Sequence, residues 1–415
     1  MNKISVIIIG AGLSGLAAAY ELSKDKRFAI TVLEERDHVG GRAHAVTVNN
    51  TAIDVGGFII YPWYKNFRKI LDELNMTKKL SPLPRLDILY DLTGNGTLLP
   101  EAKIPISLAT KGRMAAKLLP AFLNNLDVAH PNIERFNEMC VRDFLQKQVP
   151  SLNDAQLETY IDIICQGYCY PPISKYKAAF MLPMMGNNLF SGNIRTADYF
   201  PKSMDEMLNV LEHTLKKRGV EIQKNISVKS IKKHHVITKD KTVNADAIIV
   251  SHPVDVKISF TRFVTVTVTC DSNPILTHPA SWGALFLHPN TCTSPNILSV
   301  INTQELYGKK IQHTLTLNIK LSENETMPTA TAAYAKQITD QLKKLFPHLK
   351  KATITSCTPW NHTMPMSDAK TIQKLREDQG KDGIFYAGDY LGCPSMETAV
   401  TTGIDAAELI KKMIK

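Results

Sequence analysis

The feature that most constrains this chain is a glycine turn that follows an apolar run near its N-terminus. Residues 6–9 read Val-Ile-Ile-Ile, and residues 10–15 read Gly-Ala-Gly-Leu-Ser-Gly. In such a G-x-G-x-x-G turn the first glycine permits the tight bend, the second lets the backbone approach a diphosphate, and the third lets the helix pack closely on the strand. The helix start then presents free N–H groups to the phosphates. We assign five residues to this phosphate site: Gly10, Ala11, Gly12, Ser14 and Gly15.

An acidic residue closes the next predicted strand, as a dinucleotide site requires. The strand at 29–33 leads into Glu34, about 20 residues beyond the glycines, where a carboxylate accepts hydrogen bonds from both ribose hydroxyls. Because a carboxylate repels a ribose phosphate, this position disfavours NADP. Glu35 is assigned to the same site, and residues 36–38 are interpreted as a solvated turn.

Two further glycine doublets favour FAD over NAD. Residues 40–42, Gly40, Gly41 and Arg42, resemble the G-G-R of FAD enzymes, in which backbone amides and an arginine contact the diphosphate. Arginine suits this role because its planar fork binds phosphate oxygens bidentately. The second doublet, Gly56 and Gly57, lets the chain pass close to the flat isoalloxazine ring.

From residue 54 to residue 62 the chain resembles the flavin-containing amine oxidase superfamily, which includes amine oxidases, protoporphyrinogen oxidases and phytoene-type carotenoid desaturases. The resemblance continues in family order through residues 219–231, 246–253 and 388–400. It implies a Rossmann-like α/β domain that binds FAD and is discontinuous in sequence. It also implies a second, α+β substrate domain of mixed sheet and helices.

The same resemblance assigns roles to five more residues. Val228 is expected to lay its backbone against the adenine, and Gly388 with Asp389 is expected to bind the ribityl and pyrophosphate region. A helix opening near Ser395 and Met396 would aim its N-terminus at the flavin N1–C2=O edge. That positive end stabilises an anionic reduced flavin.

Length and motif order together predict two domains, since 415 residues suffice for two packed cores. The FAD-binding domain is expected to comprise residues 1–80, 200–255 and 355–415. The substrate domain is expected to comprise residues 81–199 and 256–354.

Composition sets expectations about compartment and covalent chemistry. The seven cysteines form no C-x-x-C pair, and no signal peptide precedes the first strand, so we expect the cytoplasm, free thiols and no metal site. Cys165 and Cys169 are spaced to share a helix face. Some amine oxidases tether flavin through a cysteine downstream of a tryptophan, but here Cys357 precedes Trp360, so non-covalent FAD is expected. The net charge of +10 is spread along the chain, which argues against a nucleic-acid partner.

Residues 111–123 mix basic and apolar side chains. Such a segment either lies on a membrane, in the manner of oily-substrate members of the superfamily, or roofs the substrate cavity. We favour the roof because Pro120 interrupts the apolar stripe. The alternative is peripheral contact at the inner face of a membrane.

Two branches of the superfamily compete for the chemistry. Amine oxidases carry a lysine on a substrate-domain strand, but Thr265 falls near that position in the strand expected at 262–268. Residues 281–289 and 359–365 resemble stretches of protoporphyrinogen oxidases, although that family follows the second stretch with Gln-Tyr and this chain has Met366 and Ser367. Trp360 is interpreted either as a residue facing the flavin or as a core anchor.

These observations predict an FAD-dependent oxidoreductase that dehydrogenates an apolar or amine-bearing organic substrate by hydride transfer to flavin N5. Oxygen or a quinone would accept the electrons. A protoporphyrinogen oxidase or desaturase type of reaction ranks above amine oxidation. A flavin-binding protein with little catalysis stays open, because glycine motifs indicate cofactor binding rather than chemistry.

Overall fold

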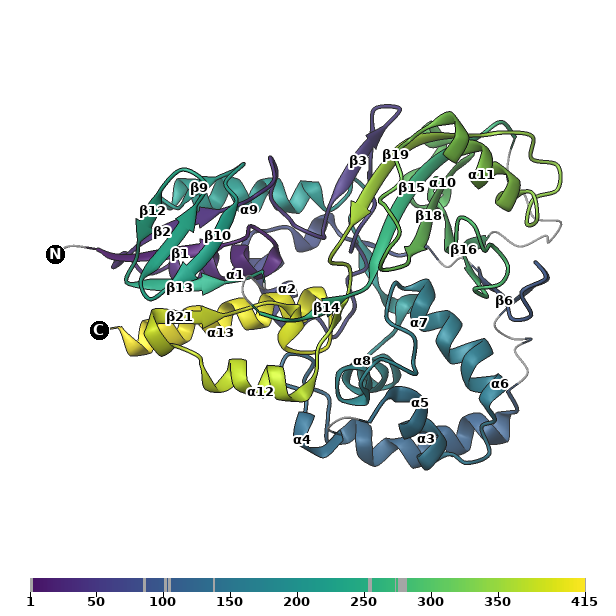
Figure 1. Ribbon diagram of the computed structural model, residues 1–415, viewed down its shortest axis with the longest axis horizontal. Helices are drawn as coiled ribbons and strands as arrows, with labels where there is room; N and C mark the ends of the chain where they lie inside the picture. Colours follow the sequence, from purple (N-terminus) through teal and green to yellow (C-terminus); the bar gives the residue numbers. More distant parts are fainter. Residues whose placement is uncertain are drawn as a thin grey trace.

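The computed structural model describes residues 3–84, 87–100, 103, 106–136, 139–252, 256–272, 274 and 282–414. The chain is mixed α/β. Two sheets lie side by side, and a group of helices lies beneath the second sheet (Figure 1). The two termini lie close together, at the end of the first sheet that points away from the second sheet (Figure 1).

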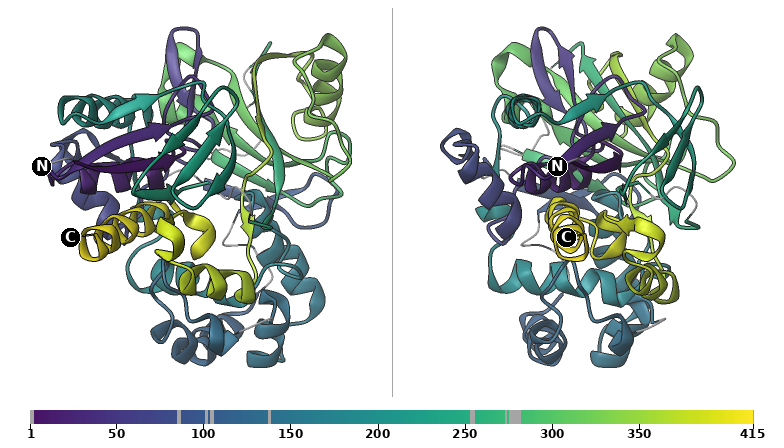
Figure 2. Two further views of the ribbon diagram at one scale, coloured as in Figure 1. Left: turned by 60° about the vertical axis from the view of Figure 1, so that its left-hand side comes forward. Right: turned by 90° about the vertical axis from the view of Figure 1, so that its left-hand side faces the viewer.

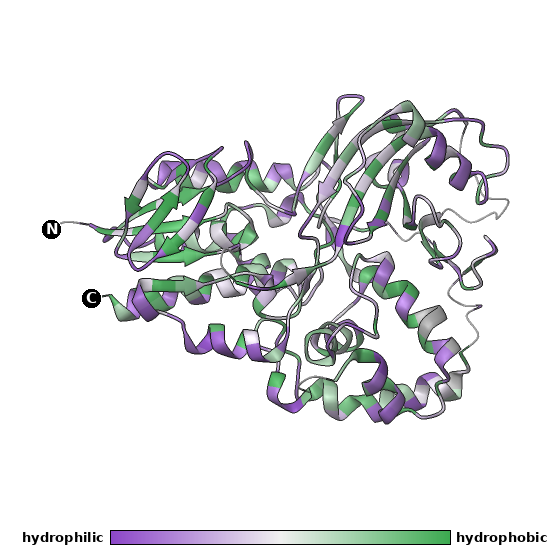
Figure 3. Cartoon of the chain, in the orientation of Figure 1, coloured by the Kyte–Doolittle hydropathy of each residue, from purple (hydrophilic) through white to green (hydrophobic). Residues whose placement is uncertain are grey.

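The first sheet is parallel throughout and is assembled from distant parts of the chain. Its order is β21-β13-β1-β2-β9, with bounds Ile384–Tyr386, Ala247–Val250, Ile4–Ile9, Phe28–Leu33 and Glu221–Gln223. The central strands are apolar on both faces (Figure 3), which is typical of a parallel sheet covered on both sides. This sheet brings the two ends of the chain together, as the sequence led us to expect.

Different layers cover the two faces of this sheet. Val6 and Ile8 point toward helices that pack on one face, whereas Ile7 and Ile9 point toward a three-stranded antiparallel sheet on the other. The helices are α1 (Leu13–Leu22), α2 (Lys65–Glu73), α9 (Asp205–Lys217) and α13 (Met396–Met413). The small sheet consists of β10 (Val228–Lys232), β11 (His235–Thr238) and β12 (Thr242–Asn244). Figure 2 shows α13 running along the parallel sheet.

The second sheet has seven strands, antiparallel except where β16 runs parallel to β6. Its order is β19 (Ala352–Trp360), β15 (Arg262–Cys270), β18 (Thr314–Leu321), β17 (Ile297–Asn302), β16 (Trp282–Leu287), β6 (Asp87–Asp91) and β7 (Leu98–Pro100). Valines of β15 and leucines of β18 pack against α11 (Ala332–Leu342). The residues between them therefore face the opposite side, which is the side of the cavity described below.

The helical part contains six helices of the described chain, and its core also includes Ala369, Ile372, Leu375, Tyr390 and Leu391 from near the C-terminus. They are α3 (Leu108–Leu123), α4 (Ile133–Phe136), α5 (Val141–Gln148), α6 (Asp154–Gln156), α7 (Ile163–Gly167) and α8 (Ala178–Phe190), with a π-helical stretch at Leu157–Asp162. None of the described helices combines the length and the apolar character needed to cross a membrane.

Short elements connect these parts. Paired strands are β3 (Ala45–Val48) with β4 (Thr51–Asp54), β5 (Ser81–Pro82) with β8 (Asp198–Tyr199), and β14 (Ser259–Phe260) with β20 (Pro365–Met366). The remaining helices are α10 (Thr303–Tyr307) and α12 (Ala369–Glu377), and 3-10 turns occupy Thr77–Lys79, Ile194–Thr196, Lys309–Ile311, Lys381–Gly383 and Asp389–Leu391.

Candidate functional site

A large cavity of about 1090 Å³ opens between the parallel sheet and the seven-stranded sheet. Small-molecule sites usually occupy about 300–1,000 Å³, so this one has room for more than a drug-sized ligand. All residues that the sequence assigned to cofactor binding line it except Ala11 and Gly15. Those that line it are Gly10, Gly12, Ser14, Glu34, Glu35, Gly40, Gly41, Arg42, Gly56, Gly57, Val228, Gly388, Asp389, Ser395 and Met396.

The cavity has two ends of different character. One end is bounded by the glycine turns and by Glu34, Arg42 and Asp389, and we call it the charged end. The other is bounded by Thr265, Ser299, Thr316 and Asn318 of the seven-stranded sheet and by neighbouring apolar side chains, and we call it the neutral end.

The first glycine turn has the close packing that its sequence predicts. Gly10 adopts a φ of +98°, which side-chain-bearing residues rarely adopt. A Cβ on Gly15 would lie 2.0 Å from the Gly10 carbonyl oxygen, so only glycine lets α1 approach the strand here. A Cβ on Gly12 would meet nothing closer than 4.0 Å, which leaves the backbone beside the cavity open to a ligand.

The start of α1 has unmet hydrogen-bonding capacity that suits a diphosphate. The Ser14 hydroxyl is buried, lines the cavity and has no hydrogen-bond partner among the described residues. An orphaned buried hydroxyl is costly unless a ligand or water meets it. The first turn of α1 consists of Leu13, Ser14, Gly15 and Leu16, so the positive helix end faces no carboxylate of its own helix. The site therefore fits the phosphates of FAD.

Glu34 carries a second role that the sequence did not indicate. Its side chain is buried and accepts hydrogen bonds from the Ala11 N–H at 2.6 Å and the Arg36 N–H at 2.9 Å. The carboxylate thus holds the glycine turn in place. Each oxygen accepts one of these bonds, so lone pairs stay available to ribose hydroxyls, and the predicted ribose contact stays a prediction.

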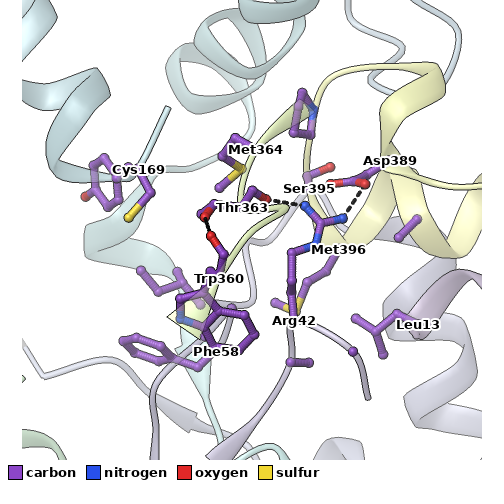
Figure 4. A pocket seen from close by; sticks show the side chains of 18 of the residues that line it. Leu13, Arg42, Phe58, Cys169, Trp360, Thr363, Met364, Asp389, Ser395 and Met396 are labelled. Carbon is purple, nitrogen blue, oxygen red and sulfur yellow. Dashed lines mark hydrogen bonds and ion pairs between the residues drawn. The ribbon is translucent and has the colours of Figure 1, made fainter. Parts of the chain in front are cut away.

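Arg42 joins the N-terminal and C-terminal halves of the charged end. Its guanidinium donates to the Asp389 carboxylate and to the Thr363 carbonyl, and Figure 4 shows it extended between them. The backbone at Gly56 packs closely against the backbone of Arg42, because a Cβ on Gly56 would lie 1.9 Å from the Arg42 carbonyl oxygen. The sequence analysis assigned Arg42 and Asp389 to this site but did not predict that they pair with each other.

The N-terminus of α13 also borders the cavity. Ser395 caps the helix, its hydroxyl accepting a hydrogen bond from the Thr398 N–H at 3.1 Å. Met396 follows and lies against Gly57, because its side chain is 3.8 Å from where a Cβ on Gly57 would be. On the other side of the charged end, Ser227 and Val228 approach the cavity where β10 begins.

Three titratable residues at the cavity were not assigned a role from the sequence. His252 and His362 both line it, with ring centroids 5.0 Å apart. Desolvation, the neighbouring ring and Arg42 lower the pKa of His252 to about 4, so this imidazole is neutral at physiological pH. Burial raises the pKa of Asp54 to about 7, and this carboxyl accepts a hydrogen bond from the Tyr307 hydroxyl at 2.7 Å. His252 lies beside the first glycine turn, because its Cβ is 3.7 Å from where a Cβ on Gly10 would be, and the sequence did not indicate this position.

The neutral end differs from the lysine-bearing pattern of amine oxidases. Thr265 lies on β15 as predicted, is buried and lines the cavity. Among the described residues, no lysine lines the cavity. Trp360 lines the cavity and also packs with Val55, Phe263 and Leu298, so it is a core residue, while its facing the flavin stays a prediction.

The cysteines and residues 111–123 are the remaining features to which the sequence analysis attached an expectation. All seven thiols are free, and the described residues contain no cluster of His, Cys, Asp or Glu that could hold a metal. Cys165 and Cys169 share no helix, because α7 ends at Gly167 and Cys169 adopts a φ of +66°. Residues 111–123 belong to α3, of which Met114 lines the cavity while Leu119 and Leu123 are exposed.

Known proteins resemble this chain in sequence and in fold. Amine oxidase [flavin-containing] B of Rattus norvegicus is 38% identical over 87 residues, which is 20% of this chain and 16% of that protein. The fatty acid isomerase of P. acnes that produces CLA superposes with a TM-score of 0.77 at 17% identity, covering 100% of both chains. A putative protoporphyrinogen oxidase from Exiguobacterium sp. 255-15 gives 0.75 at 16% identity, covering 99% of each. These two structures show the fold alone.

The family model named "Flavin containing amine oxidoreductase" matches residues 13–266 and 305–411. That match covers most of the chain and most of the residues at both ends of the cavity, although Gly10, Gly12 and Ser299 lie outside it. It agrees with FAD as the cofactor expected from the glycine motifs. The chain belongs to the flavin-containing amine oxidoreductase family.

Proposed function

We propose that this protein is an FAD-dependent oxidoreductase that dehydrogenates a largely apolar organic substrate in the manner of protoporphyrinogen oxidases and desaturases. The observation that carries the proposal is the contrast inside one cavity. A charged, glycine-lined end suits a dinucleotide, and it continues into an end bounded by neutral and apolar side chains.

The charged end supports a Rossmann-like FAD domain made of residues 1–80, 200–255 and 355–415. Ser14 and the N–H groups at the start of α1 would hold the diphosphate together with Arg42. Glu34 would accept from the ribose, and Asp389 would meet the ribityl chain. The α13 N-terminus would face the flavin ring near Gly57 and Met396.

The neutral end supports an apolar substrate. Its surroundings are aromatic and sulfur-containing side chains, which include Phe58, Tyr168, Met181, Met364 and Phe286. These groups bind an apolar body by burial and keep water from the reacting carbon. When bound, FAD supplies the two-electron acceptor for a hydride from that carbon. The described lining presents no lysine to act as the base or water-holder of an amine oxidase.

Amine oxidation is the second candidate function. It is favoured by the similarity to amine oxidase B over 87 residues, although this similarity spans only 16% of that protein. The absence of a lysine from the described cavity lining argues against it.

The test is anaerobic reduction of the purified flavoprotein. Protein that carries flavin would be mixed with simple primary amines, polyamines, a porphyrinogen and a polyene, and the loss of flavin colour would be followed before air or a quinone is admitted. Bleaching by the porphyrinogen or polyene supports the proposal. Rapid bleaching by amines would instead establish the second candidate, and no bleaching by any compound would indicate a flavoprotein with little catalysis.

A further inference from the structure

A row of polar side chains crosses the seven-stranded sheet at the neutral end. Trp360 ends β19, Thr265 lies on β15, Asn318 on β18 and Ser299 on β17, and these four strands are consecutive neighbours. Thr265 pairs directly with Asn318, and Asn318 pairs with Ser299. All four side chains line the cavity. We call them the polar row.

Hydrogen bonds run through the polar row in one direction. The Trp360 indole N–H donates to the Thr265 hydroxyl at 2.9 Å, and that hydroxyl donates to the Asn318 amide oxygen at 3.1 Å. The Asn318 amide nitrogen donates to the Ser299 hydroxyl at 3.0 Å, which donates to the Gly167 carbonyl at 2.9 Å. Because the Gly167 carbonyl can only accept, the single hydrogen of the Ser299 hydroxyl is used there, and Ser299 must accept from the Asn318 amide nitrogen. This fixes the orientation of the Asn318 amide, whose oxygen is left to accept from Thr265.

This direction leaves one amide hydrogen of Asn318, a residue that lines the cavity, without a partner among the described residues. An asparagine amide nitrogen carries two hydrogens, and the polar row uses one of them. The lining residues beside Asn318 on the same wall are uncharged, among them Ala284, Phe286 and Ile301. A hydrogen-bond donor in such surroundings is best met by an oxygen atom of a ligand.

Charged groups near this wall are engaged or lie elsewhere. Lys320 lies two residues beyond Asn318 on β18, but its ammonium donates to the Gln166 amide oxygen at 2.7 Å and it does not line the cavity. Arg195 does line the cavity, but it is exposed and lies in the separate 3-10 turn Ile194–Thr196. An ammonium or carboxylate at the polar row would therefore lose its hydration without gaining an opposite charge.

We infer that the polar row binds an uncharged oxygen of the substrate, a carbonyl or a hydroxyl, through the open Asn318 N–H. The inference rests on the proposed function, since it names the chemical class of that substrate. An apolar body would fill the aromatic and methionine-lined part of the cavity, and its single oxygen function would lie at the polar row.

The test compares head groups on one decyl chain. The FAD-loaded protein is titrated with a methyl ketone, a primary alcohol, an amine, a carboxylic acid and the bare alkane, and binding is read from the change in the flavin absorption spectrum. The ketone and alcohol are expected to bind roughly tenfold more tightly than the alkane, the gain from one hydrogen bond of about 1–1.5 kcal/mol. The amine and acid are expected to bind more weakly than the alcohol.

Variants separate the hydrogen bond from general packing. Asn318→Leu is expected to bring the ketone to the affinity of the alkane, while Asn318→Asp, which keeps the shape but adds a negative charge, is expected to shift the preference toward the amine. Asn361→Leu is the matched control, because Asn361 lines the cavity outside the polar row, and it should keep the wild-type ranking. The circular dichroism spectrum of each variant checks that it folds.

Three outcomes would overturn the inference: equal affinities for all five compounds, a preference for the amine or acid, or an Asn318→Leu variant that keeps the wild-type preference. A preference for the acid would point to Arg195 instead. These titrations need no turnover. Their failure is therefore distinct from failure of the proposed function, which appears as missing flavin or as no anaerobic bleaching.

Discussion

At the charged end of the cavity the protein leaves hydrogen-bonding capacity unmet, whereas at the neutral end it satisfies nearly all of it internally. At the charged end the Ser14 hydroxyl has no partner among the described residues, although Arg42 and Asp389 pair with each other. The polar row, in contrast, is a continuous chain of hydrogen bonds from Trp360 to Gly167. The difference indicates a strong, specific ligand at the charged end and selection by shape and by one hydrogen bond at the neutral end.

The two ends also differ in the origin of their residues. The charged end depends on turns in which neighbouring residues act together, such as Gly10 to Gly15. The neutral end depends on side chains that four strands bring into register. Experiments that place a charge at the neutral end, or remove one from the charged end, test this division.

The largest effect is expected from changes to the charged end. Glu34→Arg removes the acceptor of the Ala11 and Arg36 N–H groups and puts a donor-only cation at the ribose position. Asp389→Ala leaves Arg42 without its carboxylate partner. Each is expected to weaken FAD binding by at least about 2 kcal/mol, roughly thirtyfold. The flavin-to-protein ratio after gel filtration and the Kd for FAD measure this.

Asp240→Ala serves as the matched control, because Asp240 is an exposed acid in the turn between β11 and β12. It should retain full flavin. If Glu34→Arg and Asp389→Ala also purify with full flavin and unchanged thermal stability, the assignment of the charged end is wrong.

A charge placed at the neutral end gives the next largest effect. Thr265→Lys puts an ammonium at a buried position that has no carboxylate partner in the polar row, and it breaks the bonds to Trp360 and Asn318. We expect the free energy of unfolding to fall by about 2–4 kcal/mol, measured by urea denaturation of the apoprotein. Thr265→Val, which removes the hydroxyl without adding charge, should cost less.

The lysine variant also tests the chemistry. Amines should still reduce the flavin slowly, because one side chain does not supply an amine-binding site. A Thr265→Lys protein as stable as the wild type and rapidly reduced by a primary amine would show that the neutral end is an amine oxidase site lacking only its lysine.

The smallest effect is expected at an ion pair that ties the helical part to α13. His130 contacts Asp127 at 3.1 Å and Asp405 at 3.0 Å, and these carboxylates raise its pKa to about 9. The stabilisation is therefore complete below about pH 6.5, the ordinary histidine pKa, and is lost as the pH rises through about 9. Because all three side chains are about half exposed, we expect at most about 1 kcal/mol.

Thermal unfolding of the wild type and of His130→Gln checks this. The Tm of the variant should be lower at acid and neutral pH and should converge with that of the wild type in strongly alkaline buffer. A difference that persists unchanged above the raised pKa would assign the effect to packing rather than charge.

The charged end could be predicted from the sequence because its physics is local. A glycine needed for a positive φ or for close packing is visible in the chain itself, and Gly10 and Gly15 meet these requirements. The pairing of Arg42 with Asp389 could not be predicted, because it joins residues 347 positions apart through the order of the parallel strands. The bond from Ala11 to Glu34 was hidden for the same reason.

The neutral end could be predicted from the sequence only in part. In β15 valines alternate with threonines, which places the threonines on the face opposite α11. That alternation could have indicated a polar cavity wall, but not the partners of Thr265, since Asn318 and Trp360 come from strands paired only in the folded sheet. The proposed domain boundaries stay a prediction.

A crystal structure of the FAD-loaded protein tests the central claim most directly, because it shows which groups surround the flavin N5. We predict the diphosphate at Ser14 and Arg42, the flavin ring extending toward Thr265 and Trp360, and no lysine within hydrogen-bond or single-water reach of N5. A lysine ammonium at that distance, with Lys320 turned into the cavity as the first candidate, would contradict the account and make amine oxidation the leading function. FAD bound away from the glycine turns would contradict it altogether.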